Sequence, residues 1–219
     1  MIRKSFILFL FIGSQLSTAN CQTYSDKGPE NNFQSPQNPL YWKNKKPFEG
    51  YWQQDVHYKI NAELNDSSEI ITGKEQLTYY NNSPDTLYFV YFHLYQNAFT
   101  PGSYLDNLQE NNGVHPRYGK YEKKGLGMVI SEMKSDDKEL KTELDNTVMK
   151  VFLDKPVLPN ASEIFAIKFK TYYDHGSTRR RMKSYKVWGF KHFNGCQWYP
   201  KMCVYDRKSG WNTNQHLGR

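Results

Sequence analysis

The stretch Val56-His-Tyr-Lys-Ile-Asn-Ala-Glu-Leu64 decides the class of fold, because apolar and polar residues alternate along it. A period of two is typical of a β-strand that turns one face to a core and the other to water. The pattern therefore predicts a half-buried strand, in which His57 faces solvent and not a metal ion. We expect ordered structure to begin just before it, at Tyr51.

Two more strands are expected directly after the first. Residues 70–80 repeat the alternation more loosely, with Gly73 as an interruption, and residues 81–85 supply a turn. The run 86–94 is apolar on both faces, so it is expected inside a sheet. His93, near the end of that run, is expected to be a hydrogen-bonded core residue and not a ligand.

The remaining sequence favours strands over helices. Residues 95–124 are rich in Asn, Gly, Pro and Gln and form a long excursion with at most one short helix, around 104–109. Strands are expected again at 127–135, 147–153 and 163–173. We therefore predict an all-β domain of several antiparallel sheets, arranged as a sandwich or saddle, with little helix.

The first 21 residues have the features of a signal peptide. Arg3-Lys4 precede the apolar run 5–13, and small residues follow where cleavage is expected. The run is far shorter than the roughly 20 residues of a membrane span. We expect no transmembrane span and export to the periplasm, the cell surface or the medium. A lipoprotein acylated at Cys21 is the alternative to a cleaved soluble form.

Three parts of the chain are expected. Residues 1–21 are the signal peptide, and residues 22–50 are an extended arm, since their Asn, Gln, Pro, Ser and Lys bury too little apolar surface to offset chain entropy. Residues 51–219 form one β domain, long enough to bury a core without a disulfide scaffold. The chain stops in polar, aromatic-rich sequence, so we expect it to be the front part of a longer protein.

The charge of the chain argues against a nucleic-acid partner. The formal net charge of +7 is mild for 219 residues. The basic cluster Arg179-Arg180-Arg181, with Lys183, has no recognition helix or stacking sheet beside it. We expect that cluster to be a solvated loop.

The sequence contains no motif for chemistry of its own. It has no Gly-rich phosphate loop, no nucleophile elbow and no His-Glu-x-x-His helix. The nearest approach to a ligand set, His192, Cys196, Cys203 and His216, lacks the paired short spacings of a zinc site. We expect no metal, no cofactor and no catalytic residue in this chain. A disulfide between Cys196 and Cys203 would need an intervening turn, and buried free thiols are the default.

Several short pieces, in the same order, carry a resemblance to a known family. These are Tyr58-Lys-Ile-Asn-Ala-Glu-Leu64, the strand with Gly73, Phe92-His93-Leu94, Val157-Leu-Pro-Asn160, and Gln197-Trp-Tyr-Pro200 followed by Tyr205-Asp206-Arg207. Over residues 53–218 the chain resembles the N-terminal β domain of aminopeptidase N-like zinc metallopeptidases, the gluzincins that include leukotriene hydrolase. The pattern of these pieces is most similar to that in secreted bacterial members of the family.

This resemblance implies a role in peptide hydrolysis by a longer parent protein. The parent would use a zinc-activated water, with zinc and catalytic residues in a C-terminal catalytic domain that this chain lacks, so the chain alone should be inert. The segment 192–199 would form a wall for the peptide substrate, with Asn194 and Gln197 as hydrogen-bonding amides and Tyr199 as an aromatic side. Alternatively, Gln197 and Tyr199 satisfy backbone groups and pack an interdomain seam.

Two features keep other interpretations open. The family commonly has a Gln-x-Glu element before the aromatic-Pro segment, whereas residues 192–197 contain no acidic residue. Ordinary aminopeptidase specificity is therefore not implied. The competing class is a stand-alone secreted β-sandwich module that binds a glycan or a protein through exposed Trp188, Trp198 and Trp211, although large aromatic side chains more commonly pack in a core.

Overall fold

The computed structural model describes residues 37–38, 41, 46–177 and 182–217 of the chain. The chain divides into two compact units, 1–48 and 49–219. The predicted signal peptide and most of the predicted arm lie outside the described residues, as do Cys21 and the arginine cluster 179–181. Export and the division into three parts therefore stay predictions. Within the described residues, no helix is long and apolar enough to cross a membrane.

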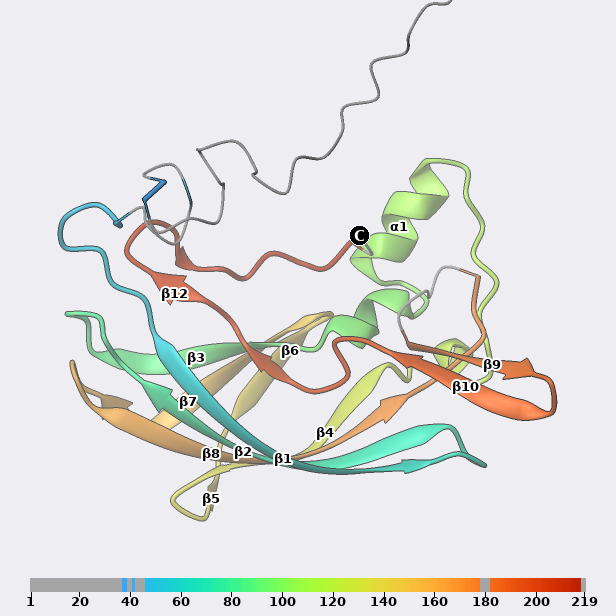
Figure 1. Cartoon of the computed structure of the whole chain (residues 1–219), viewed down its shortest axis with the longest axis horizontal. Helices are drawn as coiled ribbons and strands as arrows, with labels where there is room; N and C mark the ends of the chain where they lie inside the picture. The colour runs from blue at the N-terminus through green and yellow to red at the C-terminus, as the bar shows by residue number, and fades with distance from the viewer. Residues whose placement is uncertain (1–36, 39–40, 42–45, 178–181, 218–219) are drawn as a thin grey trace, which may run out of the picture. The chain divides into compact units, whose positions relative to one another are not determined.

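The second unit consists of antiparallel sheets (Figure 1). Strands hold 49% of the described residues and helices 9%, so the prediction of an all-β fold with little helix is confirmed. The first sheet has the strand order β1 (Asp55–Asn65), β2 (Ile70–Tyr80), β8 (Ser162–Tyr172), β4 (Met128–Ser135) and β5 (Lys138–Glu139). The second has the order β11 (Lys201–Met202), β3 (Leu87–His93), β7 (Val148–Val157) and β6 (Thr142–Asp145).

Smaller elements complete the unit. Two hairpins pair β9 (Met182–Val187) with β10 (Phe190–Gly195) and β12 (Tyr205–Asp206) with β13 (Gly210–Trp211). The excursion between β3 and β4 contains the 3₁₀ turns η1 (Tyr95–Phe99) and η2 (Glu122–Lys124) and the helix α1 (Tyr104–Asn111). The short helix expected around 104–109 is therefore present, and the Ser103 hydroxyl caps its N-terminus by accepting the backbone N–H of Asp106.

The main core lies between the two larger sheets. Alternate residues of β2, β8 and β4 pack against the inner residues of β3 and β7, as the edge-to-face contact between Phe92 and Phe165 at 5.8 Å illustrates. This is the packing of a β-sandwich. A second cluster, around Phe169, Tyr173 and Met182, lies under the β9–β10 hairpin.

The first two predicted strands are present, with differences in burial. β1 is an edge strand, so only Tyr58 and Ile60 of its apolar set are partly buried, while Val56 and Leu64 are exposed. His57 faces solvent, as predicted. Gly73 does not interrupt β2, because it pairs with Phe169 across the sheet and the Phe169 ring occupies the space where a Cβ would stand.

The expected burial of the third strand is only partly found. β3 lies between β11 and β7, and its Val90 and Phe92 are buried, but Tyr88 is 64% exposed. β7 runs to Val157, past the predicted end at 153. Its pairing with β3 shifts register between Leu87 and Phe89, and the shift accommodates the sequence around Pro156, which cannot donate to a ladder.

Candidate functional site

The predicted wall segment, residues 192–199, joins two sheets. It begins in β10 and leads through residues 196–200 into β11, which pairs with β3 of the sandwich. Gln197 has a backbone φ of 56°, in the left-handed region, and so bends the chain where it leaves the hairpin. The segment therefore consists of the end of β10 and the connection that crosses from the hairpin to the sandwich, which we call the crossing segment.

Side chains from the core fix the backbone of this crossing. The Gln96 amide donates to the carbonyl oxygens of Cys196 at 2.9 Å and Gln197 at 3.2 Å, and the Thr171 hydroxyl donates to that of Trp198 at 2.7 Å. Gln96 and Thr171 are both fully buried. Three consecutive carbonyls thus have partners outside the segment, which holds its path rigid.

The three predicted contact residues lie along this crossing in different environments. Asn194 is exposed on β10, opposite Lys183 of β9. Gln197 and Tyr199 are half-buried. The Tyr199 ring contacts Tyr58 edge-on at 5.5 Å. The structure places all three on one short segment, and their contact with a substrate stays a prediction.

A buried carboxyl that sequence reasoning missed lies in the core near Tyr58. Glu75 of β2 is 2% exposed, and neither of its oxygens has a hydrogen-bond partner within the described part of the chain. Burial raises the pKa of Glu75 to about 8, because desolvation penalises the charged form. Glu75 and Tyr199 both lie close enough to Tyr58 for their charges to raise its pKa, although burial is the largest cause.

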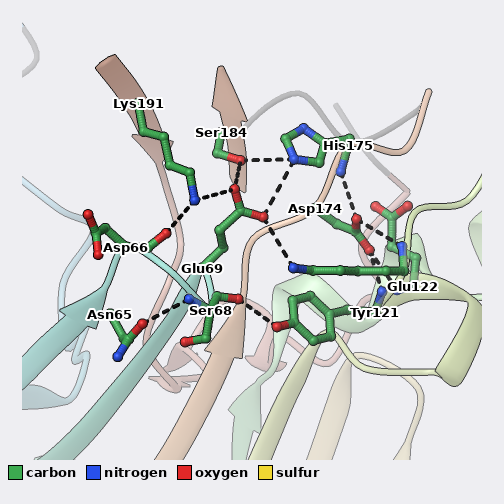
Figure 2. A network of polar contacts seen from close by, with 11 residues as sticks. Asn65, Asp66, Ser68, Glu69, Tyr121, Glu122, Asp174, His175, Ser184 and Lys191 are labelled. Atoms are coloured by element: carbon green, nitrogen blue, oxygen red, sulfur yellow. Dashed lines mark hydrogen bonds and ion pairs between the residues drawn. The ribbon is translucent and has the colours of Figure 1, made fainter. Parts of the chain in front are cut away.

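A polar network around Glu69 anchors the β9–β10 hairpin (Figure 2). The Ser184 hydroxyl of β9 donates to Glu69 Oε1 at 3.0 Å, and the Lys191 ammonium of β10 lies 3.3 Å from the same oxygen. Lys120 and His175 approach Oε2 at 3.6 and 3.5 Å. Burial raises the pKa of Glu69, but the hydrogen bonds from Ser184 and Lys191 and the nearby positive charges outweigh it, so the net shift is downward.

Asp174, which follows β8, organises the loop beside this network. Its buried carboxylate accepts the backbone N–H groups of Lys120, Tyr121 and Glu122 at 3.1, 2.7 and 2.8 Å, and that of His175 at 2.8 Å. A carboxylate at the start of η2 satisfies backbone donors that the turn leaves open. Glu69 and Asp174 together tie the β1–β2 turn, the η2 loop and the hairpin to one another.

Ser184, His175 and Glu69 resemble a nucleophile, a base and an acid, but their geometry does not support that chemistry. In a catalytic triad the histidine uses one nitrogen for the serine and the other for the acid. Here Nε2 of His175 faces both Ser184, at 3.2 Å, and Glu69, and the Ser184 hydroxyl donates to the carboxylate. Ser184 is also buried. The network is therefore a structural anchor.

No metal site is apparent in the described ranges. No group of three His, Cys, Asp or Glu side chains there could hold an ion. Cys196 and Cys203 are both free thiols, and burial raises the pKa of Cys203 to about 12, so its thiol is unreactive. His93 is buried and stacks on Tyr95 at 4.8 Å, consistent with the expected core role.

The three tryptophans of the alternative interpretation have different environments. Trp198 packs beside Phe169 at 6.2 Å, and Trp211 stacks on Tyr205 at 4.7 Å, so both are half-buried. Trp188 is 93% exposed. Of the three, Trp188 alone offers a free aromatic face.

Comparisons with known proteins give a distant structural similarity. No protein-family model and no curated protein sequence matches the chain. Similar solved structures include the M1 zinc metallopeptidase from Deinococcus radiodurans, at 13% identity and a TM-score of 0.36 over 55% of this chain and 20% of that one. A mutant of that peptidase bound to a Tyr-Ser-Ala substrate and a two-domain M1 mutant bound to L-tryptophan have the same identity, TM-score and coverage of this chain, with 21% of their own chains covered.

The match thus spans about a fifth of the length of those structures. At this identity and TM-score, the similarity establishes neither the family nor the activity of this chain.

Proposed function

We propose that the chain is the N-terminal β domain of an exported, aminopeptidase N-like zinc metallopeptidase, and that it forms one wall of the parent's substrate site. The proposal rests on the sequence resemblance around Gln197-Trp-Tyr-Pro200. The observation that carries it is the crossing segment, whose carbonyls are held by Gln96 and Thr171. A substrate wall needs a backbone fixed by its supporting shell.

The side chains on this wall have separate roles. Gln197 is half-buried at the bend and would hydrogen-bond the peptide substrate through its amide. Tyr199 would flank the peptide with its ring, which packs edge-on against the Tyr58 ring. Asn194, more exposed, would contact the substrate farther out. The parent's catalytic domain would supply the zinc ion, so this chain alone should cleave nothing.

The wall supplies no acidic group for a substrate amino terminus. Residues 192–197 contain none, and Glu75 is enclosed in the core. We infer that the parent recognises its peptide through amide and aromatic contacts on this side of the site.

Kinetics of the full-length parent test the proposal. Gln197→Ala should lower kcat/KM by about tenfold or more, since loss of a buried hydrogen bond costs about 1–3 kcal/mol. Gln76→Ala, an exposed amide on the outer face of β2, is the matched control. Unchanged kinetics with reduced thermal stability would assign Gln197 to an interdomain seam. A coding sequence without a His-Glu-x-x-His motif downstream of Arg219 would refute the peptidase assignment.

One observation favours the second candidate, a stand-alone binding module for a glycan or a protein. Trp188 is free to stack on a ligand, but Trp198 and Trp211 are packed, so neither of them offers a second tryptophan platform. Saturable binding of a soluble oligosaccharide, abolished by Trp188→Ala, would support the module.

A further inference from the structure

The turn of the β9–β10 hairpin has an unfavourable sequence for its conformation. Val187 pairs with Phe190, so Trp188 and Gly189 form a two-residue loop, with φ values of 49° and 85°. Two positive φ values define a type I′ turn, whose first position favours Asn, Asp or Gly. A bulky side chain in the left-handed region is strained. The strain at Trp188 therefore calls for a functional explanation.

The same turn exposes two large aromatic side chains. Trp188 is 93% exposed and Phe190 79% exposed, and Tyr185 behind them is 41% exposed. Figure 1 shows the turn projecting past the neighbouring strands. Aromatic side chains of this size normally bury most of their surface. The tip is therefore an apolar surface suited to a partner.

The charge of the hairpin has a single sign. Residues 182–195 contain Lys183, Lys186 and Lys191 and no acidic residue. Lys186 lies directly opposite Lys191 in the pairing, an arrangement that destabilises an isolated hairpin. Glu69 compensates Lys191 from the body of the domain. Lys183, at the base of the hairpin, donates to the Gly176 carbonyl at 3.3 Å. Lys186, next to the turn, is exposed and has no ion pair within the described residues, so positive charge remains behind the aromatic tip.

We propose that the β9–β10 hairpin is a peripheral membrane anchor: Trp188 and Phe190 enter the interface of an anionic lipid bilayer, and Lys186 attracts the lipid phosphates. Trp is enriched at membrane interfaces because its ring suits the headgroup level. Binding of this kind depends jointly on inserted apolar area and on attraction to anionic lipids. The Glu69 network fixes the hairpin to the body, so the tip is presented in one orientation.

Two other occupants fit the tip less well. A sugar stacks on a flat aromatic face and needs converging hydrogen-bond groups beside it. Gly189 and Phe190, which follow Trp188, have no side-chain hydrogen-bond group. A protein pocket would accept the aromatic tip but would not need an excess of lysine behind it. Charge complementarity therefore favours anionic lipid.

Vesicle binding by the 219-residue chain tests the anchor. The probes are phosphatidylcholine vesicles with and without about one third phosphatidylglycerol. Because the apolar run 5–13 can also bind lipid, the measured quantity is the difference between variants. Trp188→Asn should weaken binding to the anionic vesicles about tenfold, and Lys186→Gln should weaken it several-fold on those vesicles alone. Tyr88→Ser, which removes an exposed aromatic side chain from β3, should change nothing.

Thermal unfolding separates this loss from misfolding. Asn suits the left-handed position, so Trp188→Asn should keep or raise the melting temperature while it weakens binding. Binding equal to wild type by Trp188→Asn would overturn the proposal. So would equal binding to neutral and anionic vesicles, or a tip that binds only a soluble glycan or a partner protein.

Discussion

Replacement of Glu75 by glutamine should remove a large pH dependence of stability. Glu75 is enclosed between the strands of the core, with both oxygens unpaired within the described residues. Its pKa rises from the usual 4.5 to about 8 through desolvation. The unfolded chain therefore releases this proton near pH 4.5, and the folded domain keeps it until about pH 8.

The sign and size of the effect follow from linkage. Between these two pKa values the unfolded state binds fewer protons than the folded state, so stability falls as the pH rises. The fall is about 1.4 kcal/mol per pH unit. The resulting loss of folding stability, which we call the penalty of Glu75, is absent below pH 4.5, reaches about 3 kcal/mol at pH 7, and levels off above about pH 8.

Urea unfolding of wild type and Glu75→Gln between pH 5 and pH 9 measures this penalty. The buried amide leaves its own unpaired groups, at about 1–3 kcal/mol, but that cost does not vary with pH. The variant should thus be less stable than wild type at acid pH and gain on it steadily up to about pH 8. Glu63→Gln, which changes an exposed carboxyl on β1, is the control. Parallel pH profiles for wild type and Glu75→Gln would refute the reasoning.

Two further substitutions test the packing of the first sheet and the polar network around Glu69 that holds the β9–β10 hairpin. Gly73→Ala should lower the free energy of unfolding by about 1–3 kcal/mol, because the new Cβ overlaps the buried Phe169 ring; an unchanged urea midpoint would show that the ring moves freely. Glu69→Gln should cost about 2 kcal/mol at pH 7 and speed amide exchange in β9 and β10. The pKa of Glu69 is lowered in the folded domain, so the stability that its carboxylate gives is present above the usual pKa and is lost as the pH falls through the folded pKa. The unfolding free energies of the variant and of wild type should therefore converge in acid. A difference between them that stays constant with pH would contradict this.

The strands of the sandwich were predictable because their pattern is local. Residues 56–64 and 70–80 alternate with a period of two, and β1 and β2 occupy them with at most a residue of difference at each end. The β9–β10 hairpin was missed because Trp188-Gly189 does not have the composition of a favoured turn. Its strands also mix lysine with aromatic residues without a clear period, which is a weak signal for burial.

The supporting residues of the candidate site could not be predicted in the same way. Gln96 and Thr171 hold the crossing from sequence distances of about a hundred and about twenty-seven residues, and nothing near them in the sequence indicates a partner. Glu75 did leave a signal. It occupies an inner position of β2 between Gly73 and Leu77, where the alternation demands an apolar residue. A carboxyl in that register predicts a buried acid with a raised pKa.

The backbone bonds from Gln96 and Thr171 have a consequence for how this domain could diversify. Because the crossing is held through the carbonyl groups of residues 196–198, the side-chain amide of Gln197 is not what keeps its path. Substitutions there would alter the chemistry offered to a ligand and leave the loop geometry intact, much as antibody loops vary in sequence on a constant framework. New specificities could therefore arise in this lineage, or in a laboratory library, without any search for a new fold.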